Sequence, residues 1–208
     1  MAVTSKKEIQ FLLSDYHGRI RAVVERAWDE WRAVASFMSE QGMGPVLYSR
    51  TIANFVFDAI ARHAVKEFSS DPSVNIKVES QTVKFIFKGQ VLGRFKKGDE
   101  NKLGRNIPTL SAMMFVDSEG IFPGLPPETA KVEFVWLPNE IQTKLGEVLV
   151  VARHNDVRLW EYSIGAETGG EVIEFEPRNP PPDDDDEATD TDLVRPRTAD
   201  TEDAEKEN

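Results

Sequence analysis

The chain has 208 residues, of which 40% are hydrophobic, and it carries a formal net charge of −11 and no cysteine. This length suits one domain with an extension, since a domain typically has about 100–200 residues, and the apolar content is enough for a sizeable core. The absence of cysteine excludes disulfide frameworks, thiolate metal sites and cysteine nucleophiles, and the acidic balance argues against a surface that as a whole binds nucleic acid or an anionic membrane.

The N-terminal stretch MAVTSKKEIQFLLSDYHG contains no apolar core of the length found in signal peptides. Nowhere in the chain does an apolar run approach the ~20 residues of a membrane-spanning helix. We therefore expect a cytoplasmic protein that makes no contact with a membrane.

Two amphipathic helices are predicted in the N-terminal third. From Tyr16 to Met38 apolar residues recur at three- and four-residue steps, the spacing that places them on one side of a helix. A second such pattern runs from about Leu47 to Phe68. The segment QGMGP, residues 41–45, separates the two, because glycine favours a helix end and proline cannot continue a helix. The two helices are expected to form an antiparallel pair.

From Val74 onward the apolar period changes to two, the period of a strand with one buried face. Strand patterns occur at 74–78, 83–87, 132–136, 148–152 and 157–164. We predict an α+β fold, in which the two N-terminal amphipathic helices pack on a five- or six-stranded, mainly antiparallel sheet. Residues 1–72 form the helical part of this domain and residues 73–165 its sheet part.

Residues 166–208 are predicted to be a disordered acidic tail. Within this segment, residues 177–208 carry 12 acidic and 4 basic side chains, whereas residues 1–176 carry 24 and 21. The tail is rich in proline and has no aromatic residue after Phe175, so it cannot bury enough apolar surface to offset the entropy of ordering. One short edge strand, at 171–175, is considered within it.

The hairpin that follows residue 82 has a register that the side-chain pattern determines. A three-residue turn at 88–90 places Phe87 opposite Val91 and Phe85 opposite Gly93, so that the apolar side chains share one face. A two-residue turn would pair Phe85 with Arg94 and split the set. Since a slip by one residue moves every side chain to the other face, we expect the three-residue turn.

This register gathers basic side chains on the opposite face of the hairpin. From residue 84 to residue 105 there are seven basic and two acidic residues, a net charge of +5. Three interpretations remain open: a solvated outer face that protects an edge strand, a surface that binds nucleic acid or an acidic protein, and a surface onto which the acidic tail folds back. The candidate anion- or partner-binding residues are Lys84, Arg94, Lys96, Lys97, Lys102 and Arg105.

A long connection, residues 105–128, contains a second candidate site. Thr109 can cap a short helix that carries Leu110, Met113 and Met114. The connection is interpreted either as a crossover packed on the sheet or as a partner-docking loop, because loops of this length in compact domains are often functional. If it docks a partner, the apolar anchors are Ile121, Phe122 and Leu125.

Catalytic and cofactor motifs are missing from the sequence. There is no P-loop, no dinucleotide-binding glycine motif opening a helix, no nucleophile elbow and no HExxH motif. His17, His63 and His154 are not spaced as metal ligands, and no acid-x-Lys pair suited to a nuclease follows an acidic residue on a neighbouring strand. We expect no metal, no cofactor and no enzymatic activity.

Four segments together resemble a known family. The succession KGQVLGRFKK, RNIPTLSAMMF, FPGLPP and a strand pair that ends in LWEYSI is similar to a family of uncharacterised bacterial proteins. Members are often encoded beside ImmA/IrrE-type metallopeptidases and repressor-like regulators, in toxin–antitoxin or phage-defence settings. The resemblance covers about Val74 to Ile164, implies a role that depends on a partner, and carries no active-site residue.

The function predicted from the sequence is therefore that of a non-enzymatic interaction protein, an antitoxin-like or regulatory component of a bacterial defence or toxin–antitoxin system that binds a protein partner. The alternative is a nucleic-acid-binding protein that uses the basic hairpin face, with the acidic tail gating access to it. An enzyme with an unrecognised site is a third class. The oligomeric state is left open.

Overall fold

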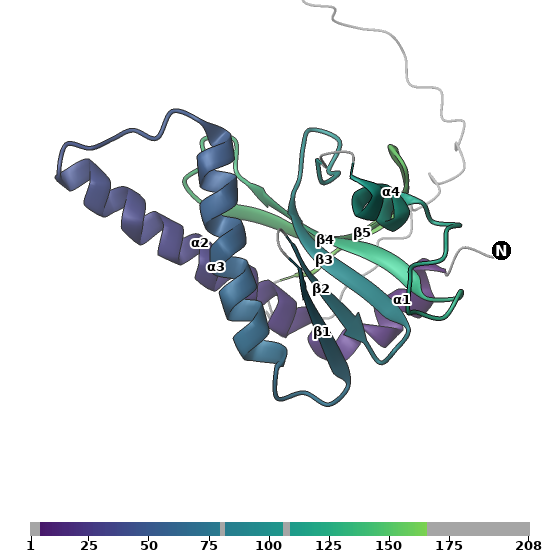
Figure 1. Ribbon diagram of the computed structural model, residues 1–208. Coiled ribbons are helices and arrows are strands. Elements are labelled where there is room, and N and C mark those ends of the chain that lie inside the picture. Colours follow the sequence, from purple (N-terminus) through teal and green to yellow (C-terminus); the bar gives the residue numbers. More distant parts are fainter. Residues whose placement is uncertain (1–4, 80–81, 106–108, 166–208) are drawn as a thin grey trace, which may run out of the picture. The chain divides into compact units, whose positions relative to one another are not determined.

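A computed structural model describes residues 5–79, 82–105 and 109–165 (Figure 1). The predicted disordered tail at 166–208, with the edge strand considered at 171–175, lies outside these residues. The helices of the described part are α1 (Lys6–Leu12), the 3-10 turn η1 (Ser14–Tyr16), α2 (His17–Glu40), α3 (Ser49–Phe68) and α4 (Leu110–Val116). The strands are β1 (Val74–Glu79), β2 (Thr82–Phe87), β3 (Val91–Lys97), β4 (Ala130–Pro138), β5 (Leu145–His154) and β6 (Val157–Ser163).

The six strands form one sheet in the order β1-β2-β3-β4-β5-β6. Neighbouring strands are antiparallel except for β3 and β4, which are parallel. The predicted α+β class and the packing of helices on a sheet are confirmed, and the sheet is mixed. Because a parallel pair needs a crossover of a dozen or more residues, the segment 98–129, which contains α4, joins the two.

The β2–β3 hairpin has the register that its pattern predicted. Phe87 pairs with Val91 and Phe85 with Gly93. The turn residues Lys88 and Gly89 have φ angles of 49° and 67°, and Gln90 N donates to Phe87 O at 2.9 Å. A glycine in the middle of the turn accepts this left-handed conformation without a steric cost, which helps to keep Val83, Phe85 and Phe87 on one face, while Ile86 lies on the other.

That face of the sheet holds the main core, against α2 and α3. Phe85, Phe87, Phe134 and Trp136 are almost fully buried there, and the Trp136 ring lies 6.0 Å from that of Trp28 in α2. Each fully buried aromatic side chain contributes about 1.5–3 kcal/mol relative to exposure. This layer is therefore the principal source of stability in the described domain.

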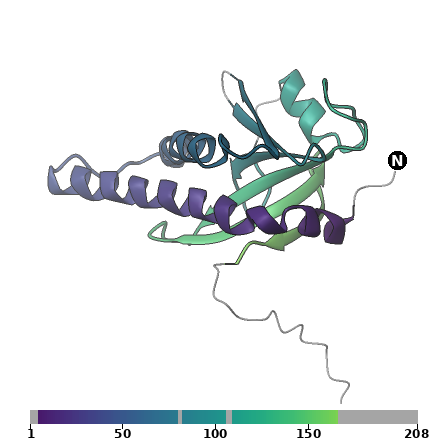
Figure 2. The same cartoon turned by 90° about the horizontal axis from the view of Figure 1, so that it is seen from below.

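The opposite face of the sheet is covered by the crossover, which the sequence did not establish. Figure 2 shows α2 and α4 on opposite sides of the sheet. Phe115 of α4 and Phe122 pack with Leu92 in one small cluster, and Leu103 packs with strand residues in another. The predicted capping of this helix is confirmed, since Thr109 Oγ1 accepts from Ala112 N at 3.2 Å. The interpretation of this segment as a packed crossover is confirmed.

Lys131 of β4 fixes the end of α4 on the sheet. Its ammonium donates to the carbonyl oxygens of Met114, Asp117 and Gly120 at 2.8, 2.7 and 2.5 Å. A cation at the carboxyl end of a helix satisfies carbonyl groups that have no partner within the helix. The crossover is thus held by the partly buried charge of Lys131 as well as by apolar contacts.

Helix α1 precedes the first predicted helix and was missed from the sequence. Ser5 caps it by accepting from Glu8 N at 3.3 Å. Ile9 is the buried residue of this helix. Among the described residues, no helix is both long and apolar enough to cross a membrane.

An ion-pair cluster ties the start of α2 to the end of α3. Arg19 donates to Glu67 Oε1 at 3.1 Å and to Asp71 Oδ2 at 2.5 Å. Hydrogen bonds from the side chain and backbone of Ser73, together with Arg19, lower the pKa of Asp71 to about 2. The carboxylate therefore stabilises the fold above the normal aspartate pKa, and this contribution is lost as pH falls from about 4 towards 2.

We expect Asp71→Asn to lower the melting temperature at pH 7 and to make the loss of stability between about pH 4 and pH 2 less steep. Thermal unfolding followed by circular dichroism at a series of pH values measures both effects. Asp29→Asn is the matched control, since Asp29 is exposed on the same helix as Arg19. Parallel pH profiles for Asp71→Asn and the unaltered protein would contradict the assignment.

Candidate functional site

The basic residues predicted to form an exposed surface are spread over both faces of the sheet and the loop after β3. Lys84 lies opposite Arg94, and Lys96 follows on the same face of β3, as predicted. The crossover covers that face, however, so that Lys84 is 1% exposed and Arg94 3%. The prediction that these two side chains present a solvent-facing anion surface is wrong, because each is buried and paired.

Lys84 joins the sheet to the crossover. Its ammonium donates to Glu79 Oε2 at 2.7 Å and to Ser111 Oγ of α4 at 3.0 Å, and it lies 4.5 Å from the centre of the Phe122 ring. The hydrogen bond from Lys84 lowers the pKa of Glu79. A desolvated cation over an aromatic face is stabilised by about 2 kcal/mol. The role that these contacts indicate is structural.

Arg94, Glu133 and Arg153, on the adjacent strands β3, β4 and β5, form a buried charge network. Arg94 donates from Nε and Nη2 to Glu133 Oε1 at 3.2 and 2.6 Å, while its guanidinium stacks 3.9 Å from the centre of the Phe115 ring. Glu133 Oε2 accepts from Gly104 N at 3.2 Å and from Arg153 Nη1 at 3.4 Å. Glu133 is 0% exposed, so this carboxylate is the centre of the network.

Lys96 lies beside this network and is partly exposed. Its aliphatic stem is tight against the backbone of Gly104, where an added Cβ would approach Lys96 Cβ to 2.6 Å. Burial, the charge of Arg94 and that of Arg153 lower the pKa of Lys96 to about 8, although Glu133 opposes the shift. Of the six predicted basic residues, Lys96 is the one whose acid–base chemistry is altered most.

The remaining three basic residues do not join this group. Lys97 points to the other face of β3, where its ammonium lies 5.9 Å from the Trp136 ring and burial lowers its pKa; it belongs to the strand and not to the following loop. Lys102 pairs with Glu147 at 2.9 Å, which raises the pKa of the lysine. Arg105 is exposed. The six residues therefore do not form one surface.

The three predicted docking anchors are also divided. Phe122 is buried, so the prediction of an exposed anchor is wrong for this residue. Leu125 is partly buried and packs against the same small cluster. Ile121 is 57% exposed. The sequence of a connection rich in proline and apolar residues does not distinguish a partner-docking loop from a crossover packed on the sheet, because both need the same residue types.

The histidine environments do not assemble a catalytic triad among the described residues. Ser118 Oγ lies 2.9 Å from His154 Nδ1, and Asp117 Oδ1 approaches the same nitrogen at 3.7 Å. In a triad the acid orients one ring nitrogen while the other activates the serine. Within the residues that the structure describes, no group of His, Asp and Glu side chains is arranged to hold a metal ion.

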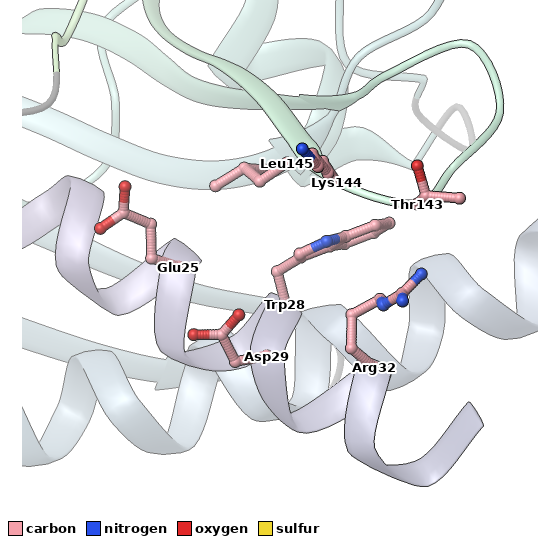
Figure 3. Close-up of a pocket in the computed structure, with 7 residues that line it drawn as sticks. All are labelled: Glu25, Trp28, Asp29, Arg32, Thr143, Lys144 and Leu145. Carbon is pink, nitrogen blue, oxygen red and sulfur yellow. The ribbon is translucent and has the colours of Figure 1, made fainter. Parts of the chain in front are cut away.

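A shallow groove of about 380 Å³ lies between α2 and the β4–β5 hairpin. In Figure 3 the Trp28 indole lies between the helix and hairpin residues Lys144 and Leu145. Carboxylates and cations line the groove together, and Glu25 is already held by Arg21 at 2.7 Å. The mixed charge and the lack of a nucleophile–base pair in this lining give the groove no defined chemistry.

Exposed apolar side chains concentrate on residues 37–48, which we call the α2–α3 arm. Figures 1 and 2 show the carboxyl end of α2 and the following loop extending past the edge of the sheet. The exposed fractions in the arm are 57% for Phe37, 56% for Met43, 79% for Leu47 and 64% for Tyr48. The sequence analysis missed this surface, although four large apolar residues around a Gly–Pro turn were a signal.

No family model matches the chain. No curated protein and no solved structure matches it either. The exposed and buried side chains described above are therefore the basis for assigning a function.

Proposed function

We propose that the protein is a non-enzymatic interaction protein that binds a protein partner through the α2–α3 arm. The observation that carries this proposal is the exposure of Phe37, Met43, Leu47 and Tyr48 on one connection. Single exposed apolar residues are ordinary, but their concentration on a surface is typical of protein interaction sites.

The size of the arm is suited to the centre of an interface. Aromatic side chains bury about 150–250 Å² each, so Phe37 and Tyr48, each more than half exposed, offer roughly 100 Å² apiece. Met43 and Leu47 add further apolar surface. A standard interface buries about 800 Å² per partner, with an apolar centre and a polar rim. Arg32 and Arg50, both exposed at the borders of the arm, are suited to that rim. The partner surface we expect is apolar at its centre.

The partner class follows from the resemblance of residues 74–164 to proteins encoded in bacterial defence and toxin–antitoxin settings. We propose an antitoxin-like or regulatory role there, with the product of a neighbouring gene as the first partner to test. The arm, residues 37–48, lies outside residues 74–164, which carry the resemblance.

The alternative of nucleic-acid binding has lost its main support. Such binding needs cations that reach phosphates, and Lys84 and Arg94 are buried. Gating by the acidic tail was part of that hypothesis and concerns residues outside the described part of the chain. We therefore propose protein binding as the single function.

The test replaces the arm's apolar anchors. Phe37→Ser with Leu47→Ser is expected to weaken partner binding at least tenfold, since truncating one central anchor residue costs about 2 kcal/mol. The intact protein, immobilised by an affinity tag, is used to capture its partner from the source bacterium and, separately, the purified product of the adjacent gene. Titration by calorimetry then measures the dissociation constant for each form.

Phe11→Ser is the matched control, because Phe11 is an aromatic residue with 78% exposure in α1. Residues 17–36 of helix α2 separate it from the arm, a length of about 30 Å. Equal weakening by the control and arm variants, or unchanged binding by the arm variant, would contradict the proposal. Recovery of nucleic acid alone with every form would favour the alternative.

A further inference from the structure

The buried face of the sheet contains more positive than negative charge around Lys96. Arg94, Lys96 and Arg153 lie around Glu133, the one buried carboxylate among the residues that the structure describes. Asp156 also pairs with Arg153, at 3.0 Å, but its side chain is fully exposed, where water screens the charge. Charges removed from water need a close counter-charge. The cation with the weakest pairing is therefore the one whose charged form is least stable.

Glu133 has little capacity left for Lys96. Its Oε1 accepts two hydrogen bonds from Arg94, and its Oε2 accepts from Gly104 N and from Arg153. Within the described part of the chain, Lys96 Nζ makes no hydrogen bond and no ion pair. The carboxylate nearest to the lysine is thus already used by two guanidinium groups.

The lysine, and not an arginine, is the group that can respond by losing a proton. Guanidinium groups stay charged in proteins, whereas an ammonium deprotonates readily when it is desolvated or lies next to another cation. The pKa of Lys96 is accordingly lowered to about 8. Of the basic residues that follow β3, Arg105 is exposed and Lys102 is paired with Glu147 at 2.9 Å.

We propose that Lys96 is a reactive amine and a site of covalent acylation by small anionic acyl donors, of which acyl phosphates are the simplest class. The proposal rests on its place beside Arg94 and Arg153, on its lack of a carboxylate partner in the described structure and on its partial exposure. The net positive charge of the cluster also favours the approach of a negatively charged donor at a distance, without direct contact from the buried guanidinium groups.

The reaction is an acyl transfer to nitrogen. The lone pair of neutral Lys96 Nζ attacks the carbonyl carbon of the acyl phosphate, and the new C–N bond forms as the C–O bond to phosphate breaks. The bonding pair leaves with the phosphate oxygen, and the surplus proton on nitrogen passes to water. The product is a neutral amide, which lowers the positive charge of the cluster by one.

The experiment treats the folded, full-length protein with acetyl phosphate at pH 7.5 and maps acetylated lysines over time by mass spectrometry of chymotryptic peptides. Lys96 is expected to react roughly tenfold faster than Lys88 or Lys102, because at this pH a far larger fraction of its amine is neutral. Lys88 and Lys102 are internal controls, since each donates to a carboxylate at 2.9 Å. The rate at Lys96 is expected to rise with pH around a midpoint near the pKa of about 8.

A neutral acyl donor, the N-hydroxysuccinimide ester of acetic acid, separates nucleophilicity from recruitment. The preference for Lys96 is expected to be larger with acetyl phosphate and to shrink towards the neutral reagent's value in high salt. Lys96→Arg keeps the charge and should abolish the fast phase of incorporation. Acetylation of Lys96 no faster than that of Lys88 and Lys102, or a rate that keeps rising as for an ordinary lysine up to pH 10, would overturn the proposal.

Discussion

Glu133→Ala is expected to lower the free energy of unfolding by about 3–5 kcal/mol, the range for removing one partner of a buried ion pair. The substitution leaves Arg94 and Arg153 on adjacent strands beneath the crossover, with Arg94 only 3% exposed. The loss arises from buried Arg94, which loses this carboxylate, and from Arg153, which keeps only the exposed Asp156 as a counter-charge. The Gly104 N–H also no longer donates to the carboxylate. Chemical denaturation followed by tryptophan fluorescence measures it.

Glu147→Ala is the control for Glu133→Ala. Glu147 lies on β5 and pairs with Lys102, but its side chain is 51% exposed, so the expected change is within about 1 kcal/mol. Arg94→Met combined with Glu133→Leu should cost less than Glu133→Ala, since the double change removes the pair and leaves fewer unpaired charges. If Glu133→Ala cost no more than Glu147→Ala, the buried network would not contribute to stability.

Gly93→Ala is expected to destabilise the protein by about 1–3 kcal/mol through overpacking. A Cβ at this position would lie 2.5 and 2.6 Å from Phe134 Cε2 and Cζ and 3.4 Å from Phe87 Cε2. The Phe134 ring is held by Phe95 at 5.1 Å and by Phe87 at 5.7 Å between ring centres. It cannot move aside without displacing its neighbours, because protein interiors are close-packed.

Gly165→Ala is the matched control, since a Cβ there meets nothing within 4 Å and its φ is not in the left-handed region. Its effect should stay within about 0.5 kcal/mol. Equilibrium denaturation gives both values under the same conditions. An equally small change for Gly93→Ala would mean that the aromatic layer is loose enough to accept a methyl group, in conflict with the packing described above.

The alternation of basic and apolar residues in β2 and β3 predicted a solvent-exposed basic face, which the structure shows to be buried at Lys84 and Arg94. Lysine and arginine are seldom fully buried unless paired, so alternating basic residues normally indicate solvent. In this protein the rings of Phe115 and Phe122 stack on Arg94 and Lys84, and Glu133 and Glu79 supply the counter-charges. Glu133 lies on β4 and Glu79 on β1, so both acids are outside the β2–β3 hairpin. The sequence of the hairpin does not relate them to these cations.

The same arrangement connects the fold with the two proposed properties. Burial of Lys84 and Arg94 leaves Lys96 as the partly exposed member of the group, which is why the chemistry is proposed at that residue alone. The arm owes its exposure to the length of α2. Ion-pair and ring contacts with α3 run from Arg19–Glu67 to Trp31–Phe55, and Ala35 still packs on the main core. Beyond Ala35 the helix continues for five residues, to Glu40.

Local patterns determined the elements and their inward faces. The three-residue turn followed from the requirement that Phe85, Phe87 and Val91 share a face, and the cap at Thr109 followed from side-chain chemistry; both depend on residues close together in the chain. Most of the helix positions were predicted from the spacing of apolar residues, which also lie close together in the chain. Helix α1 was the exception, since a seven-residue helix has too few turns to show a period.

Only the tertiary structure decided what covers each surface. That β3 and β4 run parallel, that Glu133 lies between Arg94 and Arg153, and that Phe122 faces the sheet while Phe37 and Leu47 face solvent all depend on contacts between distant segments. A side chain's spacing reveals which face it occupies, but burial depends on whether another segment returns to that face. Because the crossover covers the basic face of the hairpin, the candidate sites are Lys96 and the α2–α3 arm and not the hairpin as a whole.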